Sequence, residues 1–177
     1  MAELALLVAL ALSGQFAAAD AGVGGRLGWR PNPVLGVEGE MTVYPGDFPG
    51  SRPFSRGRVE GLFGVTAGPP LGRIRPFAKF RAGFLTIREA QAPFPCILIY
   101  PPPLACALAS GQTLAALDAG GGVQVAVSRR SFVRVDGGDR MIRYPGPVFE
   151  MAPRRIREAS FFDHDVRFSV SAGVQFE

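Results

Sequence analysis

Hydrophobic and polar residues alternate with a period of two along most of this chain. The pattern is clearest in 114–144, LAALDAGGGVQVAVSRRSFVRVDGGDRMIRY, which predicts one long β-hairpin. In its first arm, Val123 and Val125 belong to an apolar set that alternates with a polar set containing Asp118 and Gln124. Successive side chains of a strand point to opposite faces, so each set occupies one face of the predicted strand. A short turn at 128–131 joins the two arms.

The same alternation recurs in the segments 20–30, 34–44, 58–67, 74–87 and 164–177. Stretches rich in proline, glycine and small polar residues separate these segments and predict turns and loops. From the second segment on, the connections are alternately short and long: short at 31–33, 68–72 and 128–131, and long at 45–57, 88–112 and 145–162. This order is typical of an outer-membrane barrel, in which short turns lie at one end and longer loops at the other. A short helix is one option for APRRIREASFF in the last loop.

The N-terminal segment has two interpretations. Residues 4–12, LALLVALAL, followed by the alanines at 17–19, resemble the apolar core and cleavage site of a signal peptide. However, no Lys or Arg precedes the run, and Glu3 occupies the place where positive charge belongs. The alternative is a strand at 3–13, which completes eight strands and places both chain ends on the short-turn side. We favour the strand, because seven strands would leave an unpaired sheet edge in lipid, and a true signal peptide is then expected upstream of Met1.

The two faces of the predicted strands differ in chemistry. Five positions of an apolar face span a band of about 23 Å at a strand tilt near 40°, which is close to the band of ~25 Å that outer-membrane barrels show. Glycines of the polar face, at 22, 24, 120, 122 and 138, are expected to make room for long arginines and to permit curvature. The same face carries charges that would be costly in lipid, so we expect a luminal ion-pair network of Glu38, Glu40, Arg58, Glu60, Arg75, Lys79, Arg81, Asp118, Arg134, Asp136 and Arg167.

The sequence therefore predicts an all-β fold, an eight-stranded antiparallel up-and-down transmembrane β-barrel that forms a single domain over 1–177. No run of 18 apolar residues is present, which argues against a membrane-spanning helix. The net charge of +4 is modest and the arginines are scattered through the strands, so no nucleic-acid partner is expected. A soluble sandwich is the alternative, but its apolar faces would hold few large residues and no helix would cover them.

The alternating segments, the hairpin GGGVQVAVSRRSFVRVDGGDRMIRY and the ending FSVSAGVQF together resemble the OmpA-like eight-stranded outer-membrane β-barrel family. The resemblance implies a bacterial outer-membrane location, outer-membrane lipid as surroundings and the barrel-insertion machinery as a partner. It also implies that the ending is an assembly signal, carried by Phe168, Val170, Val174 and Phe176. Glu177 departs from the family pattern, because an aromatic residue usually closes the chain.

The long loop 88–112 contains Cys96 and Cys106, which are expected to form a disulfide in an exported protein. Closing this loop would stabilise the fold by about 2–3 kcal/mol in the chain-entropy model. The alternative is a pair of free apolar cysteines.

Other candidate sites give weaker signals. Asp163, His164 and Asp165 suggest a metal or catalytic site, but alternation sends His164 and Asp165 to opposite faces. The glycine-rich run at 22–28 misses the spacing of a phosphate-binding loop. Three arginines of the last loop could bind lipopolysaccharide phosphates, but a solvated loop is the favoured interpretation: Arg154, Arg155 and Arg157.

We accordingly predict no catalytic residue, no metal and no cofactor. The expected role is structural or interactive: a small barrel whose lumen is filled by ion pairs and which presents external loops. The alternatives are an outer-membrane enzyme that acts on lipid A, a narrow pore and, with less support, a soluble lipocalin-like ligand-binding barrel, which would need an apolar lumen and a polar exterior.

Overall fold

A computed structural model of the chain describes residues 8–17, 20–44, 57–87, 112–145, 148–151, 154–157 and 160–176. Its strands follow the predicted segments closely, and they are β1 (Val8–Ala17), β2 (Asp20–Trp29), β3 (Leu35–Tyr44), β4 (Arg58–Ala67), β5 (Ile74–Ile87), β6 (Gln112–Ala126), β7 (Ser131–Tyr144), β8 (Val148–Met151), β9 (Arg154–Arg157) and β10 (Phe161–Phe176). Among the described residues, no helix is long and apolar enough to cross a membrane.

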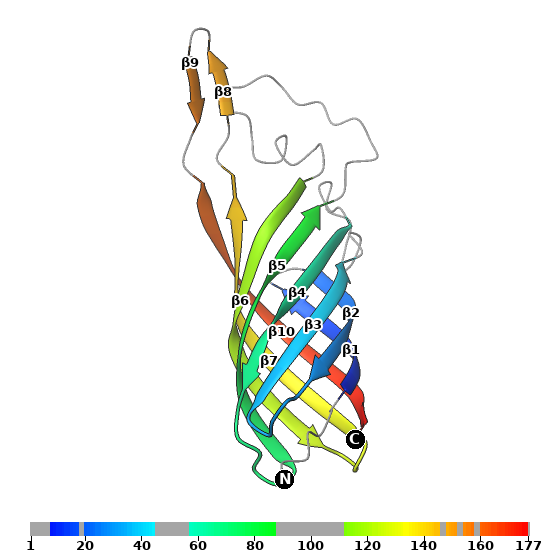
Figure 1. The fold of residues 1–177 in the computed structure, drawn as a ribbon. Helices are drawn as coiled ribbons and strands as arrows, with labels where there is room; N and C mark the ends of the chain where they lie inside the picture. The colour runs from blue at the N-terminus through cyan, green and yellow to red at the C-terminus, as the bar shows by residue number, and fades with distance from the viewer. Residues whose placement is uncertain are drawn as a thin grey trace.

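The main sheet is antiparallel throughout, and strands that follow one another along the chain are hydrogen-bonded neighbours (Figure 1). The order is β1-β10-β7-β6-β5-β4-β3-β2, and β1 forms ladders with both β10 and β2, so the two ends of the sheet meet. The prediction of an all-β, antiparallel, up-and-down sheet is confirmed. The two sets of residues that alternate along each strand therefore lie on the inner and the outer face of the barrel.

Three tight turns gather at the end of the barrel where β10 finishes (Figure 1), which we call the short-turn end. In the turn between β2 and β3, Asn32 Oδ1 accepts hydrogen bonds from the backbone N–H groups of Val34 (3.0 Å) and Leu35 (2.7 Å). In the turn between β6 and β7, Ser128 Oγ accepts one from Ser131 N at 3.0 Å. Gly72, in the turn between β4 and β5, has a φ of +64°, which other residues adopt only at a cost. These local bonds explain why short hairpins form at the predicted positions.

Two elements differ from the sequence-based expectation, one in its bounds and one in its type. β1 covers Val8–Ala17, whereas a strand over 3–13 was predicted. Ser13 and Gly14, a dipeptide that often marks a turn, lie inside the observed strand, which continues to Ala17. In the last long loop, β8 and β9 pair as a two-stranded hairpin, so the option of a short helix there is wrong. The short alternating stretches of this loop, VFEM and RRIR, favour strands over a helix.

The strands are unequal in length. β1, β2, β3 and β4 each have 10 residues, whereas β5, β6, β7 and β10 have 14, 15, 14 and 16. The four long strands are neighbours in the sheet, and they extend further at the end opposite the short turns (Figure 1). One side of the barrel is therefore taller than the other.

Inward-facing glycines lie where the backbones of adjacent strands approach closely. A Cβ atom on Gly120 would overlap the carbonyl oxygen of Gly137, and one on Gly122 would overlap that of Val135. We expected these glycines to make room for arginine side chains, but the atoms they accommodate belong mainly to the neighbouring backbone. By contrast, a Cβ atom on the outward-facing Gly25 would meet nothing within 4 Å. The inner glycines therefore permit the tight coiling of the sheet.

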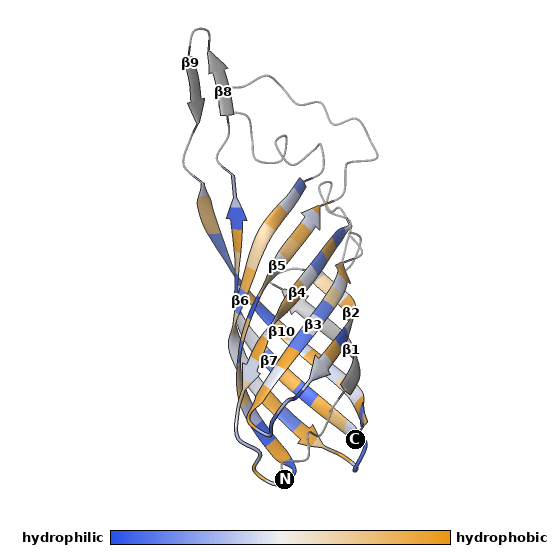
Figure 2. Ribbon diagram, viewed as in Figure 1, coloured by the Kyte–Doolittle hydropathy of each residue, from blue (hydrophilic) through white to orange (hydrophobic). Residues whose placement is uncertain are grey.

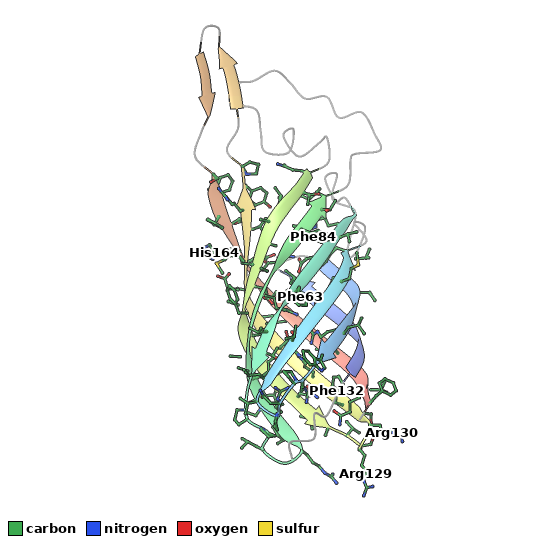
Figure 3. All side chains as sticks on the ribbon, viewed as in Figure 1. Phe63, Phe84, Arg129, Arg130, Phe132 and His164 are labelled. Carbon is green, nitrogen blue, oxygen red and sulfur yellow. The ribbon has the colours of Figure 1, made fainter. Side chains whose placement is uncertain are left out.

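The outer wall is apolar. Hydrophobic and hydrophilic residues alternate along most strands of the barrel, as the colours in Figure 2 show. Phe63 and Phe84 project from the outer wall (Figure 3), and the side chain of Phe63 is 65% exposed. The large apolar residues on the outside that are at least 40% exposed also include Val23, Leu27, Trp29, Met41, Val65, Phe80, Val135, Val166, Phe168 and Val170. Such a surface is the inverse of that of a water-soluble barrel.

Candidate functional site: the charged interior

The interior of the barrel is filled with charged side chains. The second face of the strands turns inward, and twelve of its charged residues are at most 8% exposed: Arg26, Glu38, Glu40, Glu60, Arg75, Lys79, Arg81, Asp118, Arg134, Asp136, Arg140 and Arg167. A buried charge without a partner costs several kcal/mol of folding free energy, so the stability of the barrel depends on how these groups pair.

Arg81 lies at the centre and is fully buried. Its Nε donates to Asp118 Oδ2 at 2.8 Å, and its Nη1 donates to Glu40 Oε2 at 2.8 Å. The same Nη1 lies 3.4 Å from Glu38 Oε1. One guanidinium thus joins carboxylates from β3 and β6, and the planar group offers enough donors to bind all of them.

Towards the short-turn end, Arg134 forms a two-pronged contact with Glu38, through Nη1 at 2.6 Å and Nη2 at 3.0 Å. Its Nε donates to Asp136 Oδ2 at 3.1 Å. Lys79 Nζ bridges two aspartates, Asp136 Oδ1 at 2.5 Å and Asp118 Oδ2 at 3.2 Å. Bidentate arginine–carboxylate pairs are among the stronger charge-assisted contacts, so this part of the interior is geometrically well defined.

Arg26 on β2 links the two preceding groups. Its Nε donates to Glu40 Oε2 at 2.6 Å, and its Nη1 lies 3.2 Å from Asp136 Oδ2. Ser169 Oγ on β10 lies 3.4 Å from the Nη2 atom of Arg26. Side chains from four strands thus meet at this guanidinium.

Towards the other end, Arg167 Nη1 donates to Glu60 Oε1 at 2.5 Å, and its Nη2 also binds Glu40. Arg140 Nη1 donates to Glu60 Oε2 at 2.7 Å, and its Nη2 binds Asp165. Glu60 is therefore held between two arginines from β7 and β10. These contacts continue the chain of ion pairs along the barrel axis.

Taken together, the contacts form one continuous set, which we call the ion-pair network. It contains six basic and six acidic residues: Arg26, Lys79, Arg81, Arg134, Arg140 and Arg167, with Glu38, Glu40, Glu60, Asp118, Asp136 and Asp165. The network is formally neutral, so each desolvated charge is offset within the interior itself.

Above the network, on the taller side, the inward face becomes apolar. Leu85, Ile87, Leu114 and Ile142 are buried together, and Tyr144 packs against them. We call these five residues the apolar crown. Some outward positions beside it are polar, as at Thr113 and Arg143, which are exposed, whereas Phe162 beside Arg143 is exposed and apolar. The outer face at the crown is thus more polar than the barrel wall below.

Nine of the eleven residues predicted for the luminal ion pairs belong to the network. Arg75 differs, because its guanidinium donates to the carbonyl oxygens of Gly68 (3.2 Å) and Val34 (3.0 Å). Arg58 is half-buried at the opposite end, with its guanidinium 5.4 Å from the centre of the Tyr44 ring.

Three network members were missed at the sequence level: Arg26, Arg140 and Asp165. All three continue the polar face of a predicted strand, so the same alternation could have identified them.

The only histidine faces outward (Figure 3). His164 Nδ1 lies 2.7 Å from Asp139 Oδ2, and the side chains of His164 and Asp139 are 61% and 44% exposed. Asp165 instead turns to Arg140 in the interior, as the alternation predicts. Within the described ranges, no three His, Cys, Asp or Glu side chains are grouped as metal ligands.

The predicted assembly signal lies on the outer face of β10. Phe168, Val170, Val174 and Phe176 are 59%, 47%, 42% and 52% exposed.

Cys96 and Cys106 lie outside the described residues, so their disulfide stays a prediction.

Comparison with solved structures places this arrangement among known folds. The N-terminal β-barrel domain of Pseudomonas aeruginosa OprF aligns with 96% of this chain and 97% of its own, with a TM-score of 0.58 and 11% sequence identity. The chain has a β-barrel fold. At this identity the likeness concerns the fold alone, and it agrees with the resemblance to OmpA-like outer-membrane barrels drawn from the sequence.

Two further solved structures align over most of their length at lower scores. Neisserial surface protein A gives a TM-score of 0.46 at 16% identity, covering 96% of this chain and 94% of that one. The attachment invasion locus protein Ail of Yersinia pestis gives 0.40 at 12% identity, covering 97% and 96%. No family model matches the sequence, and no curated protein matches it.

Proposed function

We propose that this protein is a small integral outer-membrane barrel of eight strands, with a structural or interaction role, whose lumen is closed by the ion-pair network. The observation that carries the proposal is the inversion of polarity across the wall: fully buried charges such as Arg81 and Arg167 inside, and exposed aromatic residues such as Phe63 and Phe168 outside. In water this outer surface would drive aggregation, whereas in a bilayer it is matched by lipid.

The pairing of β1 supports the count of eight strands. β1 has a continuous register with β10, from Val8 with Phe176 to Ala17 with Arg167, and a second register with β2. A wall in lipid cannot leave backbone N–H and C=O groups unpaired, so a ring without a free edge suits the proposed location.

The change of polarity at the apolar crown supports a membrane boundary. Below it, the outward side chains of β5 and β6, such as Phe80 and Val123, are apolar. At its level they become polar, as at Thr86 and Thr113. Asp139 and His164 also face outward at this end of the barrel. Lipid therefore covers the wall from the short turns up to this level, and the taller strands continue into water.

The apolar wall, the end of β10 and the loops each suggest what the protein contacts. Outer-membrane lipid contacts the apolar wall, and the barrel-insertion machinery recognises the alternating apolar ending of β10. Loop arginines, among them Arg154, Arg155 and Arg157, offer a contact to lipopolysaccharide phosphates. The loops at the taller end carry the interaction role.

The test combines location and conductance. The native protein is expected in the outer-membrane fraction and to need detergent for extraction, and the purified barrel is expected to show no conductance steps in a planar bilayer. The neutral double variant Lys79→Ala with Asp136→Ala removes side-chain volume from the lumen without changing its net charge, and it is expected to conduct. Recovery in the soluble fraction would refute the membrane location, and well-defined steps from the native protein would refute the closed lumen.

A further inference from the structure

The short-turn end of the lumen contains a partly enclosed cavity of about 30 Å³. Such a volume holds about two water molecules, which is also the space that a small tetrahedral anion needs. Four of its lining residues are arginines: Arg26 from β2, Arg30 from the β2–β3 turn, Arg75 from the start of β5, and Arg134 from β7. Glu38 is the one acid among the lining residues, so positive side chains outnumber negative ones around the cavity.

Two of the four arginines of the cavity lack an ion pair within the described part of the chain. Arg26 and Arg134 belong to the neutral ion-pair network, in which Arg134 binds Glu38. Arg30 Nη2 donates to the amide oxygen of Gln124 at 2.8 Å, and Arg75 donates only to backbone carbonyls. Among the described acids, none forms an ion pair with Arg30 or Arg75. Burial, and then the charges of Arg75 and Arg134, lower the pKa of Arg30 to about 10, so this guanidinium stays protonated but is repelled by its neighbours.

The cavity is built around these side chains. The guanidinium of Arg134 stacks on the ring of Phe77, 3.9 Å from its centre. Gly36 leaves room for Arg30, because a Cβ atom there would lie 3.2 Å from Arg30 Cγ. Arg75 is fixed by Val34 O and Gly68 O, and the Gly68 N–H also donates to Val34 O at 2.9 Å. Donors held in place before a ligand arrives lose little entropy when it binds.

We propose that this cavity binds a small inorganic oxyanion of the phosphate or sulfate class. Planar guanidinium groups match the oxygens of such ions, and the surplus positive charge of Arg30 and Arg75 supplies the attraction. Lipid head groups are excluded as the source, because the cavity lies inside the barrel wall. Arg129 and Arg130, in the β6–β7 turn at the same end (Figure 3), are exposed to water and attract anions towards this mouth.

The inference goes beyond the proposed structural role and does not depend on the membrane. An anion at this position would offset the positive charges of Arg30 and Arg75, which the ion-pair network does not neutralise. It would also connect the turns around β2, β3 and β5 at the point where the network stops.

The test is a calorimetric titration of the folded barrel, in a neutral detergent and a buffer free of phosphate and sulfate, with inorganic phosphate. One phosphate per chain is expected to bind at millimolar or lower concentration. Arg30→Gln is expected to weaken binding by roughly tenfold or more, since it removes a charged donor. Arg129→Gln removes the same charge from the same end of the barrel but not from the cavity, and it is expected to leave the affinity within about twofold, because exposed charges act weakly.

Arg30→Lys provides a variant that keeps the charge and the fold. It is expected to bind more weakly than the native protein, because an ammonium cannot make the paired contacts of a guanidinium. Circular dichroism of each variant checks that the barrel is folded. Absence of phosphate binding to the native barrel would overturn the proposal. Equal losses in Arg30→Gln and Arg129→Gln would also overturn it, since they would assign the binding to general surface charge.

Discussion

Arg134 on β7 and Glu38 on β3 form a bidentate ion pair across the interior, with distances of 2.6 and 3.0 Å. Three strands separate β7 from β3 in either direction around the sheet. The pair therefore spans the barrel rather than running along its wall, and it holds opposite sides together.

Glu38→Gln is expected to lower the free energy of unfolding by about 3–5 kcal/mol, because it breaks the bidentate pair with Arg134 and leaves the buried network with one more positive than negative charge. Urea unfolding of the barrel in lipid vesicles measures the change. The matched surface variant Arg129→Gln is expected to stay within about 0.5 kcal/mol of the native protein. Similar small effects of both variants would mean that the lumen is hydrated and the network is weak.

Gly120→Ala is expected to destabilise the barrel by about 1–3 kcal/mol, since the added Cβ overlaps the backbone of β7 and the strands must move apart. Gly25→Ala, on the outer wall of β2, meets no atom and is expected to be neutral or slightly stabilising. Thermal and urea unfolding of the two variants provide the comparison. A neutral Gly120→Ala would contradict the role of inner glycines in coiling the sheet.

Ala82→Arg and Ala115→Arg test the proposed membrane boundary with the same chemical change. Both alanines face outward and are exposed, but Ala82 pairs with Phe63 and Leu117, whereas Ala115 pairs with Phe84 and Arg143. We expect a cost of about 2–4 kcal/mol at Ala82 and about 0–1 kcal/mol at Ala115 for folding into a bilayer. Equal costs would show that lipid does not end at the level of the apolar crown.

Leu114→Ala is expected to cost about 2–5 kcal/mol, because Leu114 is buried in the apolar crown with Leu85 and Ile142. Leu71→Ala serves as the control, since Leu71 is 61% exposed in the β4–β5 turn. Proteolysis at the taller end, followed by mass spectrometry, is expected to become faster in Leu114→Ala. An unchanged rate would argue that the crown does not support the upper strands.

Strand positions and the inward face could be predicted because both depend on local alternation. Charges such as Glu40 and Arg81 fall on the polar face wherever the strand is placed, so their burial follows once the sheet is closed. Their partners depend on which strands face each other across the lumen. Glu40 binds Arg26, Arg81 and Arg167 from three different strands, and no local pattern contains that information.

The apolar crown and the cationic cavity could not be predicted for related reasons. At Leu85 and Leu114 the period of two continues, but the inward residues are apolar there and not charged. Periodicity alone does not show which of the two faces points inward. Arg75 looked like another member of an ion pair. Its carbonyl partners, Val34 and Gly68, belong to turns whose approach to β5 is set by the folded barrel.

The unequal strand lengths give the barrel an oblique rim. The four long strands exceed the others by at least four residues, or roughly 13 Å measured along the strand, and all stand on one side. A molecule approaching the taller end of the barrel would thus meet a strand wall that stands higher on one flank than on the other.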